Sequence, residues 1–186
     1  MFFVYNSYES ICKAVKKIKA NCETVNPFLI CQELGIKVVK TAMGKKTESC
    51  KGFYVTNSRI HTIVINSDLS NEFQRIICAH ELGHAVMHKN RTGLHAFHDF
   101  CLFDSASTYE YEANIFAAEL LLDDEDVIEK LNDDLSFFQA AGELYVPDEI
   151  LDFKFRTMKW KGYKMDPPLL STSTWLKNAV DRGEDF

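Results

Sequence analysis

Residues 76–87 read IICAHELGHAVM, and this stretch decides how the rest of the chain has to fold around it. Apart from Cys78, its ionisable side chains are His80, Glu81 and His84; all the others are apolar or glycine. A helix that is apolar nearly all round is buried. Two imidazoles and a carboxylate on a buried helix are costly unless they are paired or bind a ligand. The stretch therefore predicts a buried helix with a polar site at its centre.

The spacing of His80 and His84 indicates a metal site. Four residues along a helix bring both imidazoles to one face, one turn apart, where they can bind one tetrahedral zinc ion. In H-E-x-x-H sites the glutamate, here Glu81, takes a proton from the attacking water and does not bind the metal. Two core histidines hydrogen-bonded to backbone or carboxylates are the alternative interpretation. His88 continues the same row, and we interpret it as a favourable cation near the C-terminal end of the helix.

Gly83 points to a close packing contact on the same helix. A glycine inside a helix costs about 1 kcal/mol relative to alanine, so its presence there indicates a reason in the packing.

The remaining sequence predicts a mixture of helices and a few short strands. We expect a first helix capped by Ser7, a second between Asn26 and Gly35, and further helices over Ser70–Lys89, Ser107–Leu122, Ser136–Leu144 and Pro147–Lys161. We expect strands over Ile36–Lys40, Gly52–Thr56 and Ile60–Asn66. The fold class is therefore α+β.

A catalytic zinc ion takes three protein ligands and keeps one open position, so one ligand must come from another segment. The candidates are His95, His98, Asp99, Glu110, Glu112 and Glu119. We favour Glu110, because it lies with Asn114 on the apolar stripe of the helix after Ser107, where a metal and a ligand histidine would satisfy the two polar groups. Ser107 and Glu110 also fit a capping box, in which Glu110 would bond the backbone instead. Glu112 is the next candidate, ahead of the two histidines.

Two motifs together resemble the ImmA/IrrE family of metallopeptidases: HELGH at residues 80–84 and EYEANIFAAELLL at residues 110–122. The resemblance extends from about residue 52 to residue 164. It implies a minimal zincin-like domain of the gluzincin type, with a small sheet of about three strands packed on the HELGH helix. Asp123 stands where such sequences often have proline, which affects the exit from the helix.

Carried over residue by residue, the resemblance makes His80, His84 and Glu110 the zinc ligands and Glu81 the catalytic base. Asn114 then holds a ligand histidine. The activity implied is a zinc-dependent endopeptidase that cleaves a helix-turn-helix repressor of a mobile element or prophage. We leave the oxyanion donor open among Tyr109, Tyr111, His95 and His98, and expect Ile60–Asn66 to be the edge strand that pairs with substrate.

Composition agrees with a cytoplasmic protein. The net charge is −6, no apolar run is long enough to span a bilayer, and the N-terminus lacks the features of a secretory signal. The six cysteines are therefore expected to be reduced.

We expect a peptidase domain over residues 1–130 and a helical subdomain with a tail over 131–186. The last two predicted helices can form a helix-turn-helix, and five basic residues between Phe153 and Lys164 offer a nucleic-acid surface within 136–164. A helical hairpin packed on the peptidase domain is the interpretation we favour, because the chain is acidic. The alternative function is a DNA-binding or sensor regulator that retains a zinc site without proteolysis.

Overall fold

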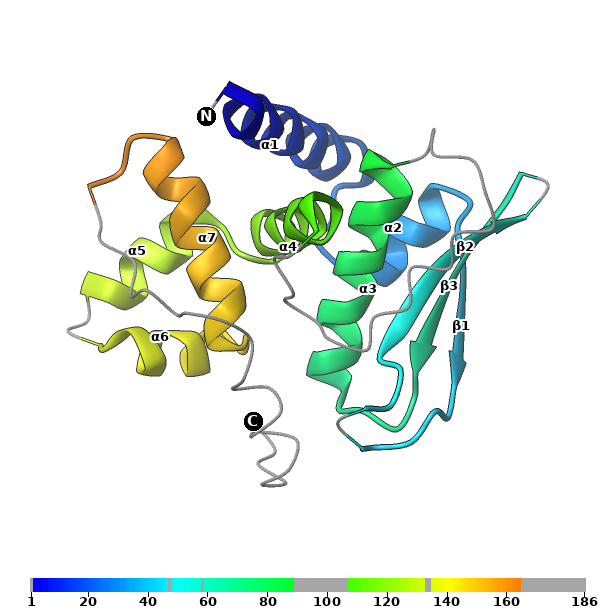
Figure 1. The fold of residues 1–186 in the computed structure, drawn as a ribbon. Coiled ribbons are helices and arrows are strands. Elements are labelled where there is room, and N and C mark those ends of the chain that lie inside the picture. Colours follow the sequence, from blue (N-terminus) through cyan, green and yellow to red (C-terminus); the bar gives the residue numbers. More distant parts are fainter. Residues whose placement is uncertain (1, 47, 58, 89–106, 133–134, 165–186) are drawn as a thin grey trace.

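A computed structural model describes residues 2–46, 48–57, 59–88, 107–132 and 135–164 of the chain. These residues form an α+β fold with three strands, as predicted (Figure 1). They contain seven helices, one more than expected, because α5 was not predicted from the sequence. The elements are α1 (Phe2–Cys22), α2 (Pro27–Glu33), β1 (Lys37–Thr41), β2 (Gly52–Asn57), β3 (Ile60–Asn66), α3 (Asn71–Met87), α4 (Thr108–Leu121), α5 (Asp124–Asn132), α6 (Phe137–Glu143) and α7 (Asp148–Trp160). None of these helices is both long and apolar enough to cross a lipid bilayer.

Polar caps determine where several helices begin. The Asn26 side chain accepts a hydrogen bond from the Phe28 amide at 3.0 Å, and the Ser70 and Ser107 hydroxyls accept from the second or third amide of α3 and α4. Ser7 does not cap α1, contrary to expectation, because the helix already begins at Phe2. Its hydroxyl is therefore available to bond a side chain on another helix.

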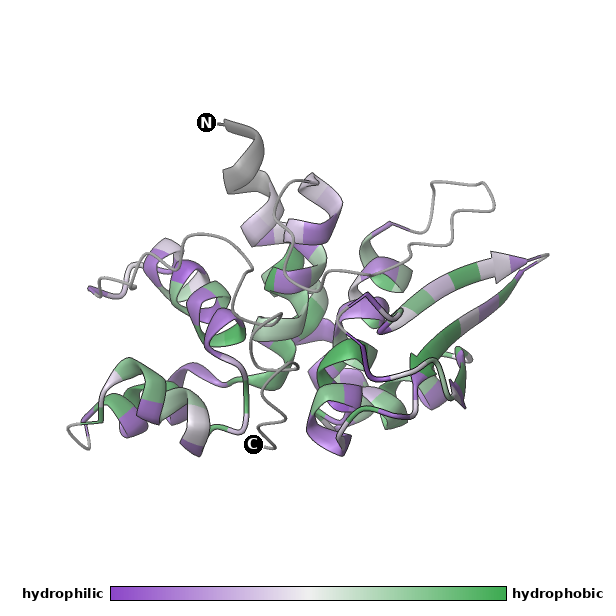
Figure 2. Cartoon of the chain, turned by 60° about the horizontal axis from the view of Figure 1, so that its bottom comes forward, coloured by the Kyte–Doolittle hydropathy of each residue, from purple (hydrophilic) through white to green (hydrophobic). Residues whose placement is uncertain are grey.

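The sheet has the order β1-β3-β2, with β3 parallel to β1 and antiparallel to β2. The prediction that Ile60–Asn66 is an edge strand is therefore wrong: β3 is the central strand. A hairpin gives β3 one neighbour from the adjacent sequence, but its second neighbour comes from β1, more than 20 residues earlier. A pattern of neighbouring residues therefore cannot predict that β1 pairs with β3. Burial alternates along β2 and through the middle of β3, as expected for a sheet with one face on the core. Figure 2 shows that the strands carry both polar and apolar residues.

Helix α3 lies between the sheet and α4 (Figure 1). Every residue from Ile76 to Ala85 is buried, which confirms the buried helix expected from the sequence. Because both sides of α3 are covered, its polar side chains point into contacts with neighbouring elements and not into solvent.

The contact between α3 and α4 is close at Gly83. A Cβ atom placed on Gly83 would lie 3.2 Å from the Ala113 Cα and 3.2 Å from the Phe116 side chain. Only glycine lets the two helix backbones approach this closely without a shift of one of them. This explains the glycine inside the helix.

Helix α7 packs on α4 and the start of α5 through a buried lysine. Lys154 on α7 is 1% exposed, and its Nζ lies 2.8 Å from Glu119 and 2.6 Å from Asp124. The neighbouring basic residues are paired too: Arg156 with Asp152 at 2.8 Å, and Lys161 with Glu119 at 2.5 Å. Three of the five basic residues proposed as a nucleic-acid surface are thus neutralised by carboxylates, which favours the packed hairpin. The domain boundary near residue 130 stays a prediction.

We predict that Gly83→Ala destabilises the protein. Overpacking a tight contact costs about 1–3 kcal/mol, and the better helix propensity of alanine returns about 1 kcal/mol. The expected net loss in the free energy of unfolding is up to about 2 kcal/mol, measured by chemical denaturation.

Gly142→Ala is the matched control, since Gly142 also lies in a helix and a Cβ there meets nothing within 4 Å. This variant is expected to be as stable as the wild type or more so. Equal effects of the two substitutions would contradict the packing argument.

Candidate metal centre

Three potential ligand atoms converge where α3 crosses α4. Glu110 Oε2, from the first turn of α4, lies 3.2 Å from His80 Nε2 and 3.5 Å from His84 Nε2. The two Nε2 atoms are 3.1 Å apart. Both imidazoles are buried, and the Glu110 side chain is 17% exposed. The one group of three or more potential ligands found among the described residues is thus the trio favoured from the sequence.

The geometry and chemistry of this trio fit a zinc ion. Bonds of about 2.0–2.1 Å in a tetrahedral arrangement place ligand atoms about 3.4 Å apart, close to the three distances observed. Two imidazole nitrogens and one carboxylate oxygen form a known set for catalytic zinc, with a fourth position left open. A cation among the three atoms would also satisfy two nitrogens that face each other in a buried place.

The electrostatics of Glu110 follow from its neighbours. Burial alone raises the pKa of its carboxyl, but the hydrogen bonds and charges of His80 and His84 outweigh burial and hold that pKa well below its usual range. Glu110 is therefore a carboxylate, the form in which it can bind a metal.

The second nitrogen of His80 also has a partner. His80 Nδ1 lies 2.9 Å from Asn114 Oδ1, one turn along α4 from Glu110, and Asn114 is fully buried. An amide oxygen only accepts hydrogen bonds, so Nδ1 carries a proton and Nε2 is the nitrogen that can bind a metal. The contact expected between Asn114 and a histidine is present.

Glu81 is fully buried and lies beside the first residue of β2. A Cβ on Gly52 would come within 3.6 Å of Glu81 Oε1 and within 2.5 Å of the Ile77 side chain. No side chain fits at position 52, so glycine lets the strand approach α3 next to Glu81. The sequence analysis did not single out Gly52.

The other carboxylate candidates lie elsewhere. Glu112 Oε2 is 3.0 Å from His88 Nε2, and its Oε1 accepts a hydrogen bond from Ser7 at 2.5 Å. Glu119 pairs with Lys154 and Lys161. Because the Glu110 carboxylate reaches the histidines, the capping-box alternative does not describe its contacts.

Candidates on the segment between α3 and α4 cannot be placed. His95, His98 and Asp99 lie outside the described residues.

His88 makes contacts that its expected role, a cation at the end of a helix, does not explain. It lies at the C-terminal end of α3, as expected, but is only 8% exposed, and its Nδ1 lies 3.0 Å from His84 Nδ1. The sequence analysis missed this contact, although the row His80, His84, His88 at four-residue spacing was the signal for it.

The two tyrosines considered as oxyanion donors differ in their surroundings. The Tyr111 hydroxyl lies 2.5 Å from the Tyr8 hydroxyl, and its ring packs against Phe153 of α7, so it faces α1 and α7. The Tyr109 ring packs edge-on against His88, which places it nearer the histidine cluster.

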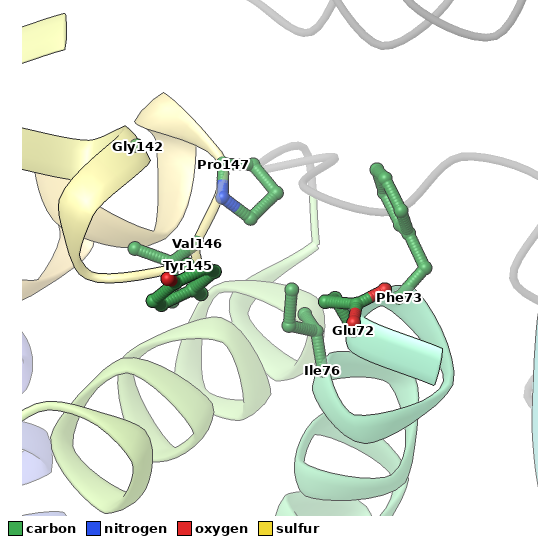
Figure 3. A pocket seen from close by; sticks show the side chains of 7 residues that line it. All are labelled: Glu72, Phe73, Ile76, Gly142, Tyr145, Val146 and Pro147. Carbon is green, nitrogen blue, oxygen red and sulfur yellow. The ribbon is translucent and has the colours of Figure 1, made fainter. Parts of the chain in front are cut away.

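An apolar pocket opens at the other end of α3 (Figure 3). Its volume is about 20 Å³, room for about one water molecule. It is lined by Glu72, Phe73, Ile76, Gly142, Tyr145, Val146 and Pro147. None of these residues belongs to the ligand trio, so we regard the pocket as separate from the candidate centre.

Comparison with known proteins agrees with this geometry. The model of the IrrE N-terminal-like domain, Peptidase_M78, matches residues 31–156. Over 147 residues the chain is 34% identical to uncharacterized immunity region protein 2 of Bacillus phage phi105, covering 79% of this chain and 90% of that protein. Over 160 residues it is 28% identical to metallopeptidase ImmA of Bacillus subtilis (strain 168), covering 83% of this chain and 88% of ImmA.

Proposed function

The chain belongs to the ImmA/IrrE family of metallopeptidases, and from this premise we propose that it is a zinc-dependent endopeptidase acting on an intracellular regulatory protein. The single observation that carries the proposal is the convergence of His80, His84 and Glu110 beside a buried Glu81. A structural zinc site needs four closed ligands and no base, whereas this set offers three ligands and a carboxylate on the same helix.

The ligand residues proposed are His80 and His84 from α3 and Glu110 from α4. Zinc bound there would supply a Lewis acid that lowers the pKa of water and polarises a peptide carbonyl. Asn114 orients His80 by accepting its Nδ1 proton.

Glu81 is the proposed catalytic base. It accepts a proton from the attacking water and later donates it to the leaving amine. Its place beside His80 on α3, shielded from bulk solvent, favours this role.

The outer edge of β2, and not β3, is the strand we propose for substrate binding. β2 pairs with β3 on one side, and Gly52 brings its start close to Glu81. The Asn66 amide donates to the Lys51 carbonyl at 3.0 Å, so the following residues Gly52, Tyr54 and Thr56 direct their backbone groups away from β3. An extended peptide can add there as a further strand.

The substrate we propose is a helix-turn-helix repressor of a mobile element or prophage. The similarity to an immunity region protein of a phage and to ImmA supports this choice. A regulator that binds DNA without proteolysis is the weaker alternative, since Lys154, Arg156 and Lys161 are paired with carboxylates.

We predict that Glu110→Ala abolishes stoichiometric zinc binding, because two histidines alone leave the ion without its third protein ligand. Metal content after dialysis against zinc is the measurement. Glu112→Ala serves as the control and is expected to retain one zinc ion per chain, with weaker affinity. The reverse pattern would show that Glu112 is the ligand.

We predict that Glu81→Gln retains zinc but loses cleavage, because the amide cannot accept the proton. Removal of a general base costs about 10²–10⁴-fold in rate. The assay is cleavage of the proposed helix-turn-helix repressor substrate, followed by gel electrophoresis. Cleavage by the variant at the wild-type rate would refute the mechanism.

We predict that Thr56→Pro raises KM for the repressor about tenfold with little change in kcat, because proline removes an outward amide donor on the edge. Thr56→Val is the matched control, since it removes the hydroxyl and keeps the amide. If Thr56→Pro has the KM of the wild type, β2 is not the substrate strand.

A further inference from the structure

A row of polar side chains continues from His84 away from the ligand trio. His84 Nδ1 lies 3.0 Å from His88 Nδ1, His88 Nε2 lies 3.0 Å from Glu112 Oε2, and Glu112 Oε1 lies 2.5 Å from the Ser7 hydroxyl. The row joins α3, α4 and α1. His88 and Glu112 are largely buried, with side chains 4% and 18% exposed.

We propose that His88, Glu112 and Ser7 are positioning residues that fix the tautomer and the ring orientation of His84. This inference rests on the proposed function, since it takes His84 as a metal ligand through Nε2. His88 reaches the ligand trio through its contact with His84. Glu112 is connected to the trio through His88 and because it shares helix α4 with Glu110.

The direction of each hydrogen bond follows from His84. A neutral imidazole carries one proton, and the nitrogen that faces the metal must be free of it. His84 therefore donates from Nδ1, and the atom opposite, His88 Nδ1, must accept.

The proton of His88 is then on Nε2, where it is donated to Glu112. A carboxylate is an acceptor only, and its second oxygen accepts the Ser7 hydroxyl proton. Every link has one donor and one acceptor. The 3.0 Å contact between His84 Nδ1 and His88 Nδ1 fits one proton between the two nitrogens.

The two ligand histidines are held differently. His80 donates to the neutral amide of Asn114, whereas the row from His84 ends on the carboxylate of Glu112. A partner that ends in a negative charge makes an imidazole a stronger metal ligand. We therefore expect the His88–Glu112 pair to matter more for metal affinity than its distance from the site suggests.

Ser7 brings the N-terminal helix into this arrangement. The match to the family model begins at residue 31, so α1 lies outside it. The next residue, Tyr8, contacts Tyr111 on α4 and stacks on Trp160 of α7, which holds Ser7 in place beside Glu112. Helix α1 thus supplies the last member of the row.

The test measures metal binding and tautomers in the full-length protein. His88→Phe is expected to weaken zinc affinity about 10–100-fold, in the range found when such outer partners are removed. Competition with a chromophoric chelator gives the affinity. His61→Phe is the matched control, because His61 contacts Tyr54 on the sheet and no member of the row, and it is expected to keep wild-type affinity. Wild-type affinity in His88→Phe would overturn the proposal.

Long-range ¹H–¹⁵N NMR of the zinc-loaded wild type shows which nitrogen of each imidazole carries the proton. Residues with a purely structural role would not determine that position. We expect the proton on Nδ1 of His84 and on Nε2 of His88. A proton on Nδ1 of His88 would overturn the proposal, whatever the affinities.

Two milder variants keep the test valid if His88→Phe does not fold. Glu112→Gln retains an acceptor oxygen for His88 and is expected to bind zinc more tightly than Glu112→Ala. Ser7→Ala removes only the last hydroxyl and is expected to weaken affinity a few-fold. Wild-type affinity in both Glu112→Ala and Ser7→Ala would overturn the proposal.

Neither the zinc affinity nor the NMR readout depends on turnover. A wild-type protein that binds zinc and cleaves nothing would therefore refute the proposed peptidase function without contradicting the role of His88, Glu112 and Ser7.

Discussion

The close crossing of α3 and α4 at Gly83 is the constraint on which the candidate centre depends. Gly83 lies between the two histidines on α3, and its neighbour Ala113 lies between Glu110 and Asn114 on α4. Because no side chain separates the backbones, short side chains from both helices meet: a carboxylate reaches two imidazoles, and an amide reaches one of them. A wider crossing would separate these four largely buried polar groups from one another, at a cost of several kcal/mol.

The rest of the fold holds this crossing from three sides. The sheet covers α3 and comes close to Glu81 through Gly52. Helix α7 holds the outer side of α4 through the buried Lys154, and α1 packs against α4 and reaches Glu112 through Ser7. The supports from α7 and α1 are polar and paired, so these two helices and the core form one connected set of contacts. The same pairing neutralises Lys154 and Arg156 of α7.

The elements were largely predictable, because their signals are local. Caps at Asn26, Ser70 and Ser107 and the alternation of β2 and β3 depend on residues a few positions apart. The errors concern distant partners. The central position of β3 requires β1, and the role of Ser7 requires Glu112, 105 residues later. His88 likewise looked like a helix-end cation because its partner lies on α4.

The sequence by itself determined the chemistry: a buried helix with two histidines one turn apart, a glutamate beside them, and a second helix whose apolar stripe contains Glu110 and Asn114. These features follow from helical periodicity and from the cost of burying charge. Only the tertiary structure decided which carboxylate meets the histidines, which strand edge stays open, and how His84 is held. Those outcomes depend on the distance and angle between elements far apart in sequence, and here a glycine without a side chain sets that distance.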